Sequence, residues 1–367
     1  MNASESQTEL VSVIIPAYNA ERYIGATLAS VIAQTHRRLE ILVVDDGSTD
    51  GTVAIVEQHM AGDGRVRLIR QRNGGVANAR NRGIAESRGP FIAPLDADDL
   101  WHPEKLETQL AAMRRSPRIG CVTTWCCTID TDDTILWEPA DGTRCEGYVL
   151  PALILEHFAG CASSPLLRRQ CVLEAGGYDE SLLRRNAQGC EDYKLLLAVA
   201  ERHEFTVIPR ALTGYRQVPD SMSCNLWTML RSHDMVIDEM RARHPEIPAK
   251  VYRWSRSGIC AWLATRAALA KDHGDMLRLL GHSIRSDWCY VLSLGVRLAT
   301  RYADRGFRSG RAVRAEVPRF FPGDLRAPEP PPKGPWLATA LQRHRRGWCE
   351  RLSAKPDKAR LSANRAL

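Results

Sequence analysis

Short apolar runs alternate with helical patterns over the first hundred residues, and this alternation constrains the fold more than any other feature. In chain order the alternating segments are 11–16, 22–34, 39–44, 51–59, 65–69, 76–87 and 90–95. Strands that alternate with helices of this length predict right-handed βαβ units and a parallel sheet. The strands are apolar at almost every position, which indicates a sheet covered on both faces. The pattern therefore predicts an α/β, Rossmann-like, mostly parallel sheet flanked by helices.

The rest of the chain continues this pattern and then changes character. The further predicted elements are a strand at 120–128, helices at 148–157, 168–175 and 191–202, and a strand at 205–209. From 226 to about 301 the pattern is almost entirely helical, and 326–335 is rich in proline. We expect an α/β domain at 1–224, a helical C-terminal extension at 225–325, and at 326–367 a Pro-rich linker with a basic, partly disordered tail.

Charge separates the two halves of the chain. The net charge is +7, but residues 1–224 carry 23 basic and 30 acidic side chains, and residues 225–367 carry 27 and 13. An acidic half suits a metal ion, and a basic half suits an anionic membrane, nucleic acid or polymer. Because the arginines are scattered without a recognition motif, we expect no nucleic-acid binding.

The remaining composition predicts a cytoplasmic protein. The 11 cysteines form no CxxC pair, which favours reduced thiols over disulfides or a zinc site. No apolar run is long enough to span a bilayer, and the N-terminus lacks the features of a secretory signal.

Polar motifs follow the predicted strands where these end, which is where ligands bind in an open parallel sheet. Tyr18 is suited to stack on a base, and Asn19 to cap the next helix. In DDGSTD two consecutive carboxylates exceed the needs of a turn, so one is expected to bind a base or a ribose. The glycine pair of NGGVANARNRG presents backbone N–H groups to an anion, and Arg80 adds charge, although a solvated basic face explains that motif equally well.

The sharpest motif is LDADD, which places Asp96, Asp98 and Asp99 at the end of a strand. Carboxylates this close repel one another unless a hard cation compensates them. Mg²⁺ or Mn²⁺, held by one or two carboxylates and by substrate phosphates, is the natural occupant. Helix capping, the alternative, needs only one aspartate.

The motif GCEDY places Glu191 and Asp192 at the start of a predicted helix. The helix dipole stabilises an ionised carboxylate there, as a general base requires. A plain capping box is the alternative for this motif taken alone.

Together these motifs resemble the inverting nucleotide-sugar glycosyltransferases of family two, of bacterial type, which have the GT-A fold. The resemblance covers about 11–224 and excludes the basic C-terminal third. The matching segments are VSVIIPAYN, VVDDGSTDGT, NGGVANARNRGI, LDADD, RRQCVLEAGGYDE, GCEDY and GYRQVPDSMS.

The resemblance implies a role for each matching residue. Asp192 would be the general base, and Asp98 and Asp99 would bind Mn²⁺ or Mg²⁺. The residues expected to bind the nucleotide sugar are Pro16, Tyr18, Asn19, Asp46, Arg80, Asp96 and Glu191. A loop at 214–223 would cover donor and acceptor. It lacks the histidine that relatives often carry there, and Ala198 replaces a frequent arginine, so the resemblance implies fewer protein ligands for the metal or diphosphate and the loss of one acceptor or phosphate contact.

The implied activity is metal-dependent, inverting transfer of a hexosyl group from a UDP-sugar to an acceptor hydroxyl, with GDP and dTDP as alternative nucleotides. The implied acceptor is a glycan or a lipid-linked glycan of polysaccharide or cell-envelope synthesis. The basic C-terminus would then contact the inner membrane face peripherally, and the helices would support the acceptor or an oligomer. The alternative function is a catalytically weak nucleotide- or glycan-binding module of the same fold.

Overall fold

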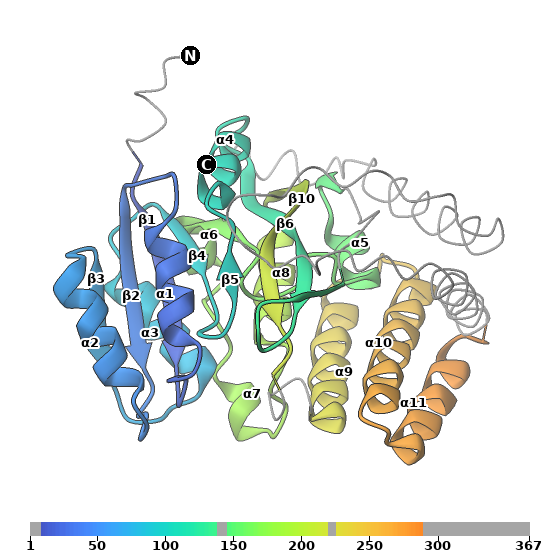
Figure 1. Cartoon of the computed structure of the whole chain (residues 1–367). Helices are drawn as coiled ribbons and strands as arrows, with labels where there is room; N and C mark the ends of the chain where they lie inside the picture. The colour runs from blue at the N-terminus through green and yellow to red at the C-terminus, as the bar shows by residue number, and fades with distance from the viewer. Residues whose placement is uncertain (1–8, 138–144, 219–224, 289–367) are drawn as a thin grey trace, which may run out of the picture.

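The computed structural model describes residues 9–137, 145–218 and 225–288 of the 367-residue chain (Figure 1). The predicted linker and tail at 326–367 lie outside the described residues, as does most of the extension beyond Trp288. Among the described helices, none is long and apolar enough to cross a membrane.

The strands of the described part form one mixed sheet in the order β3-β2-β1-β4-β9-β6-β10-β5, with β7 beside β6 and β8 beside β10. The strands are β1 (Val11–Ala17), β2 (Leu39–Asp45), β3 (Val66–Arg70), β4 (Phe91–Pro94), β5 (Leu100–Trp101), β6 (Ile119–Ile129), β7 (Ile135–Trp137), β8 (Glu146–Gly147), β9 (Leu166–Arg168) and β10 (Glu204–Arg216). The pairs β1–β2, β2–β3 and β1–β4 are parallel, as the alternating pattern predicts.

Helices cover both faces of the sheet (Figure 1). One apolar core joins α1, α2 and α4 to the sheet, and the other joins α3, α5 and α8 to the opposite face. The helices are α1 (Ile24–Ile32), α2 (Thr52–Gly62), α3 (Val76–Glu86), α4 (Lys105–Met113), α5 (Leu150–Leu155), α6 (Arg169–Glu174), α7 (Ser181–Arg184), α8 (Glu191–Ala200), α9 (Leu226–Arg243), α10 (Ala249–Leu269) and α11 (His273–Ser286).

The second half of the sheet differs from the simple parallel prediction. β9 is antiparallel to both β4 and β6, and its three residues are too few to give a strand pattern. β10 runs on to Arg216, past the predicted end at Pro209. The register with β6 shifts between Ile208 and Ala211, so the proline, which has no N–H to donate, lies in an irregularity of the ladder.

The predicted helical extension is confirmed for its described part. Helices α9 and α10 share the apolar core of α5 and α8, through Val236, Val251 and Leu263 among others. The helical pattern is interrupted twice: once after α9, and once at Lys271, which has φ +60° just before Asp272 caps α11.

Candidate functional site

The ends of β1 and β2 meet beside one another, and Tyr18 and Asn19 differ in what their side chains do there. Tyr18 is 54% exposed and therefore free to stack on a ring. Asn19 Oδ1 instead accepts a hydrogen bond from the Thr49 N–H at 2.9 Å, and its own N–H donates to Ser48 Oγ at 3.0 Å. Asn19 therefore ties two turns together and does not cap the helix as expected. Pro16 is buried inside β1, opposite Val44.

Asp46 organises the loop that follows β3. Its carboxylate accepts hydrogen bonds from Gln71 Nε2 and from the N–H groups of Gly74 and Gly75, each at 2.8 Å. Gly75 has φ +86°, a backbone conformation that favours glycine. A carboxylate has about four acceptor positions, so one remains on Asp46 for a base or a ribose. Asp46 therefore has a structural role, and its expected binding role stays a prediction.

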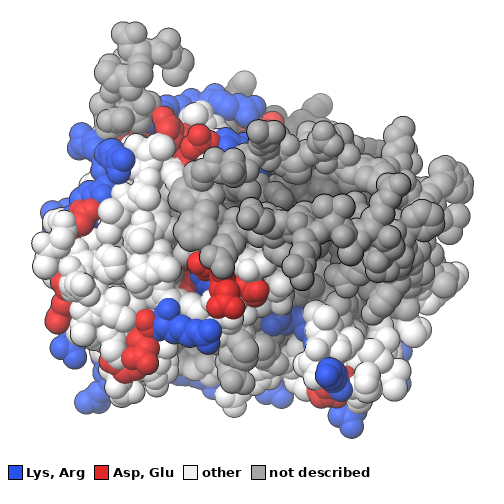
Figure 2. All heavy atoms as spheres, in the orientation of Figure 1, with Lys and Arg blue, Asp and Glu red and all other residues white. Residues whose placement is uncertain are grey.

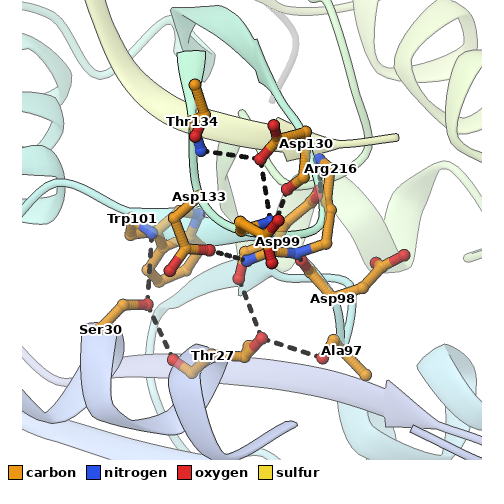
Figure 3. Close-up of polar contacts among 11 residues, drawn as sticks. Thr27, Ser30, Ala97, Asp98, Asp99, Trp101, Asp130, Asp133, Thr134 and Arg216 are labelled. Atoms are coloured by element: carbon orange, nitrogen blue, oxygen red, sulfur yellow. Dashed lines mark hydrogen bonds and ion pairs between the residues drawn. The ribbon is translucent and has the colours of Figure 1, made fainter. Parts of the chain in front are cut away.

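Residues 95–99, between β4 and β5, form a loop that we call the acidic loop, and Asp99 is its anchor (Figure 3). Its side chain is completely buried, with Oδ2 accepting from Ser163 Oγ at 2.5 Å and Oδ1 from the Arg216 N–H at 2.8 Å. Burial, with the charge of Asp98 adding to it, raises the pKa of Asp99 well above its usual range. Each oxygen accepts one hydrogen bond inside the protein, so Asp99 has a positioning role, and its expected role as a metal ligand stays a prediction.

Arg216 holds the other side of the acidic loop. Its guanidinium donates to the carbonyl oxygens of Asp98 at 2.6 Å and Asp130 at 2.7 Å, and to Asp133 Oδ1 at 2.5 Å. In Figure 3 the Asp98 side chain extends away from this network. The main chain of Asp98 is thereby fixed while its carboxylate stays available.

Asp96 and Asp98 form the pair of carboxylates that can hold a cation. Burial and the neighbouring charge of Asp96 raise the pKa of Asp98 to about 6, which is the signature of a negative charge without enough compensation. Among the described residues, no group of three or more His, Cys, Asp or Glu side chains is arranged as a metal site. Two carboxylates fit Mg²⁺ or Mn²⁺ only if substrate phosphates and water supply the remaining oxygen ligands, which is the usual mode for these ions.

Arg80 connects the acidic loop with the start of α8. Its side chain is 4% exposed, and Nη2 lies 2.5 Å from Asp96 Oδ1. The guanidinium carbon lies 5.1 Å from the centre of the Tyr178 ring. Burial opposes the charged form, but the charges of Asp96 and Asp192 outweigh it and raise the pKa of Arg80. The Arg80 Nε atom is buried without a hydrogen-bond partner among the described residues.

The two acidic residues at the start of α8 have different environments. Glu191 is 4% exposed, its Oε2 accepts from the Gly189 N–H at 2.9 Å, and burial raises its pKa. Asp192 is partly exposed, so of the two it is the one that an acceptor hydroxyl can reach. Arg80 pairs with Asp96 of LDADD and is also affected by the charge of Asp192, so the start of α8 lies near this pair.

Several site residues were missed from the sequence. Ser163 links the acidic loop to the segment before β9, because its Oγ also accepts from the Asp96 N–H at 2.9 Å. Arg216 lies in the GYRQ segment, at the end of β10. An arginine at the end of a strand is the sequence feature that could have indicated its role. Ser163 has no comparable signal. Of the predicted cover loop, residues 219–224 lie outside the described part.

Comparisons with known proteins find matches for part of the chain. Residues 12–158 match the model of "Glycosyl transferase family 2". The chain is 38% identical over 135 residues to chondroitin synthase of Escherichia coli, covering 37% of this chain and 20% of that protein. It is 46% identical over 105 residues to the putative teichuronic acid biosynthesis glycosyltransferase TuaG of Bacillus subtilis (strain 168), covering 28% and 42%. The chain thus spans well under two thirds of the length of these relatives.

Two solved structures share the fold. One is the mannosyltransferase PcManGT from Pyrobaculum calidifontis in complex with GDP-Man and Mn²⁺, with a TM-score of 0.50, 18% identity, and coverage of 76% of this chain and 86% of that one. The other is S. aureus TarS 1-349 in complex with UDP-GlcNAc, with a TM-score of 0.50, 17% identity, and coverage of 74% and 90%. These likenesses support the GT-A fold. The family match covers β1 to α5 and with them the acidic loop, so this part of the chain is similar to glycosyl transferase family 2.

Proposed function

We propose that the protein transfers a sugar from a nucleotide-diphosphate donor to an acceptor hydroxyl with inversion at the anomeric carbon. The observation that carries this proposal is the position of Arg80, whose buried side chain lies 2.5 Å from Asp96. The charges of Asp96 and, to a smaller extent, Asp192 raise the pKa of Arg80, so this cation lies near the carboxylates suited to a donor and near the carboxylate suited to an acceptor. We assign this chemistry to residues 1–224.

The donor would lie across the ends of β1, β2 and β4. Tyr18 would stack on the base, and the free acceptor position of Asp46 would bind the base edge or the ribose. UDP is our leading candidate for the nucleotide, with GDP and dTDP as alternatives. Asp98, with Asp96, would hold Mn²⁺ or Mg²⁺ against the diphosphate, and such an ion neutralises charge on the leaving group.

Asp192 would accept the proton of the attacking hydroxyl. The acceptor oxygen forms a bond to the anomeric carbon while the carbon–oxygen bond to the diphosphate breaks. The electron pair of that bond leaves with the nucleoside diphosphate, and the hydroxyl proton ends on Asp192. One displacement needs no covalent sugar–enzyme intermediate and inverts the configuration, in contrast to a retaining pair of carboxylates.

We place the acceptor among glycans or lipid-linked glycans of polysaccharide or cell-envelope synthesis. The names of the chondroitin synthase and teichuronic acid relatives support this class.

Residues 289–367 carry 17 Lys or Arg and 6 Asp or Glu, so the surplus of positive charge lies mainly outside the described residues. On the face in Figure 2, basic and acidic side chains are interspersed over the described surface.

We further propose that the basic segment from Trp336 to Leu352 contacts anionic membrane surfaces. Basic residues near such a surface contribute on the order of 1 kcal/mol each. Co-sedimentation with anionic vesicles, at low and high salt, compares the full chain with a chain that ends at Arg326. Salt-sensitive binding of the full chain alone supports the contact, and equal, negligible binding of both contradicts it.

The experiment that tests the function screens donor turnover over UDP-, GDP- and dTDP-sugars, with Mn²⁺ or Mg²⁺ and with chelator. Release of nucleoside diphosphate is measured, and NMR of the product follows the anomeric configuration. Turnover of one donor class with inversion supports the proposal. Donor binding without turnover, under every acceptor tested, supports the binding-module alternative. Retention of configuration contradicts the role of Asp192.

A further inference from the structure

Two cysteine sulfurs from distant parts of the chain meet beneath the acidic loop. Cys126 Sγ, on β6, lies 3.2 Å from Cys161 Sγ, which is 35 residues further along and precedes β9. Both are free thiols. Cys126 is partly exposed, and Cys161 is only 6% exposed. A reagent from solvent therefore reaches Cys126 first.

Gly160 makes room for this pair. It has φ +87°, and a Cβ atom at this position would lie 2.8 Å from Cys126 Sγ. Such a distance is too short for a real side chain, so only glycine allows the sulfur to sit here. The contact with Cys126, followed by burial, raises the pKa of Cys161 well above its usual range, and either thiol can donate in this contact.

The pair is connected to the acidic loop by a short stretch of chain. Ser163, two residues after Cys161, donates to Asp99 Oδ2 at 2.5 Å and accepts from the Asp96 N–H at 2.9 Å. The Ser163 carbonyl oxygen also accepts from Trp101 Nε1 at 2.8 Å. A displacement of Cys161 is therefore transmitted to the carboxylates that we propose for donor binding.

We propose that Cys126 and Cys161 form a modification site that reacts with small-molecule disulfides and closes into an intramolecular disulfide. The Cys126 sulfur attacks the reagent and releases one small thiol. The Cys161 sulfur then attacks the mixed disulfide and releases the second. Two protein thiols and one reagent disulfide become one protein disulfide and two small thiols. Two electrons pass from the protein to the reagent, and the two protein thiol protons end on the two small thiols. The sulfurs must approach to about 2.05 Å, which pulls the segment of Ser163 toward β6.

The test exposes the full chain to oxidised glutathione and then digests it with trypsin. Cleavage after Arg118, Arg144 and Arg168 places the two sulfurs on separate peptides, 119–144 and 145–168. We expect a linked pair of these peptides, assigned to Cys126 and Cys161 by fragmentation, and two fewer free thiols. Cys126→Ser should abolish the link. Cys127→Ser, one residue along the same strand, is the matched control and should retain it.

Donor turnover is measured on the same samples. We expect oxidation to lower it several-fold, dithiothreitol to restore it, and Cys126→Ser to be insensitive to the reagent. The proposed modification site is wrong if the two peptides remain unlinked after exposure to oxidised glutathione. It is also wrong if the Cys126→Ser variant still forms the link. A linked protein with unchanged turnover overturns its coupling to the acidic loop. The second measurement rests on the proposed function, but the peptide link is read without any activity, so the two failures are distinguishable.

Discussion

Arg80 Nη2 and Asp96 Oδ1 lie 2.5 Å apart, in an ion pair whose arginine side chain is 4% exposed and whose aspartate is 29% exposed. The arginine comes from α3 and the aspartate from the loop after β4. A buried cation without its partner is costly, so the pair fixes the loop in one position against the helix. The exposed side of Asp96 remains open toward a ligand.

Arg80→Ala should therefore cost about 3–5 kcal/mol of unfolding free energy, the usual range for breaking a buried pair. Arg82→Ala is the matched control, because that side chain is 55% exposed on the same helix and pairs with Glu86 at 3.0 Å. Its loss should cost at most about 1 kcal/mol. Urea denaturation of both variants measures the difference, and equal losses would show that the Arg80 pair contributes no more than a surface contact.

Asp98→Asn and Asp99→Asn should distinguish a role in metal binding from a role in the stability of the acidic loop. We expect Asp98→Asn to abolish metal-dependent donor turnover with little change in melting temperature, because the Asp98 side chain lies outside the network of Arg216. Asp99→Asn should instead lower stability by about 1–3 kcal/mol, since it weakens two buried hydrogen bonds. Mn²⁺ titration by calorimetry and thermal unfolding test both variants. Full wild-type activity in EDTA would remove the metal from the proposal.

Asp192→Asn should lower kcat by about 10²–10⁴-fold, the scale of lost general-base catalysis. Donor affinity should change little, because the residue faces the acceptor in the proposed arrangement. Calorimetry with the donor, alongside the kinetics, tests this separation. Donor binding lost together with the rate would place Asp192 in the donor pocket.

The ion pair between Asp179 and Lys194 makes the stability of the protein depend on pH. Burial acts to raise the pKa of Asp179, but hydrogen bonds from Lys194, at 2.7 Å, and from Ser181 outweigh this and lower it to about 2 from the ordinary 3.8. The folded state thus binds the proton less tightly than the unfolded state. The resulting stabilisation, about 2 kcal/mol by linkage, is complete above pH 3.8 and is lost as the pH falls through about 2.

Asp179→Asn should accordingly destabilise the protein at pH 7, and the difference from wild type should shrink as the pH falls toward 2. Asp132→Asn, at an exposed turn, is the control and should change stability little at any pH. Denaturation between pH 2 and 7 measures both. A difference between Asp179→Asn and wild type that does not depend on pH would show that the ion pair with Lys194 is not its source.

The strands β1 to β4 and the helices between them followed directly from the sequence, because periodicity reports local conformation and two-sided burial. The short strand β9 and the extension of β10 beyond Pro209 did not, since three residues give no period and a proline ordinarily ends a strand. These elements exist because neighbouring strands supply their hydrogen-bond partners.

By itself, the sequence determined the α/β fold, the resemblance of residues 11–224 to family-two glycosyltransferases and the set of polar motifs at the strand ends, since each depends on residues close together in the chain. Only the tertiary structure decided how the carboxylates divide their work. Asp99 anchors the loop because Ser163 and Arg216, 64 and 117 residues away, supply donors to its two oxygens. No described residue distant in the chain donates to the Asp98 carboxylate, which is why we propose this carboxylate for the metal. The three aspartates are the same residue type in the sequence. The positions of distant hydrogen-bond donors in the fold give their carboxylates different environments.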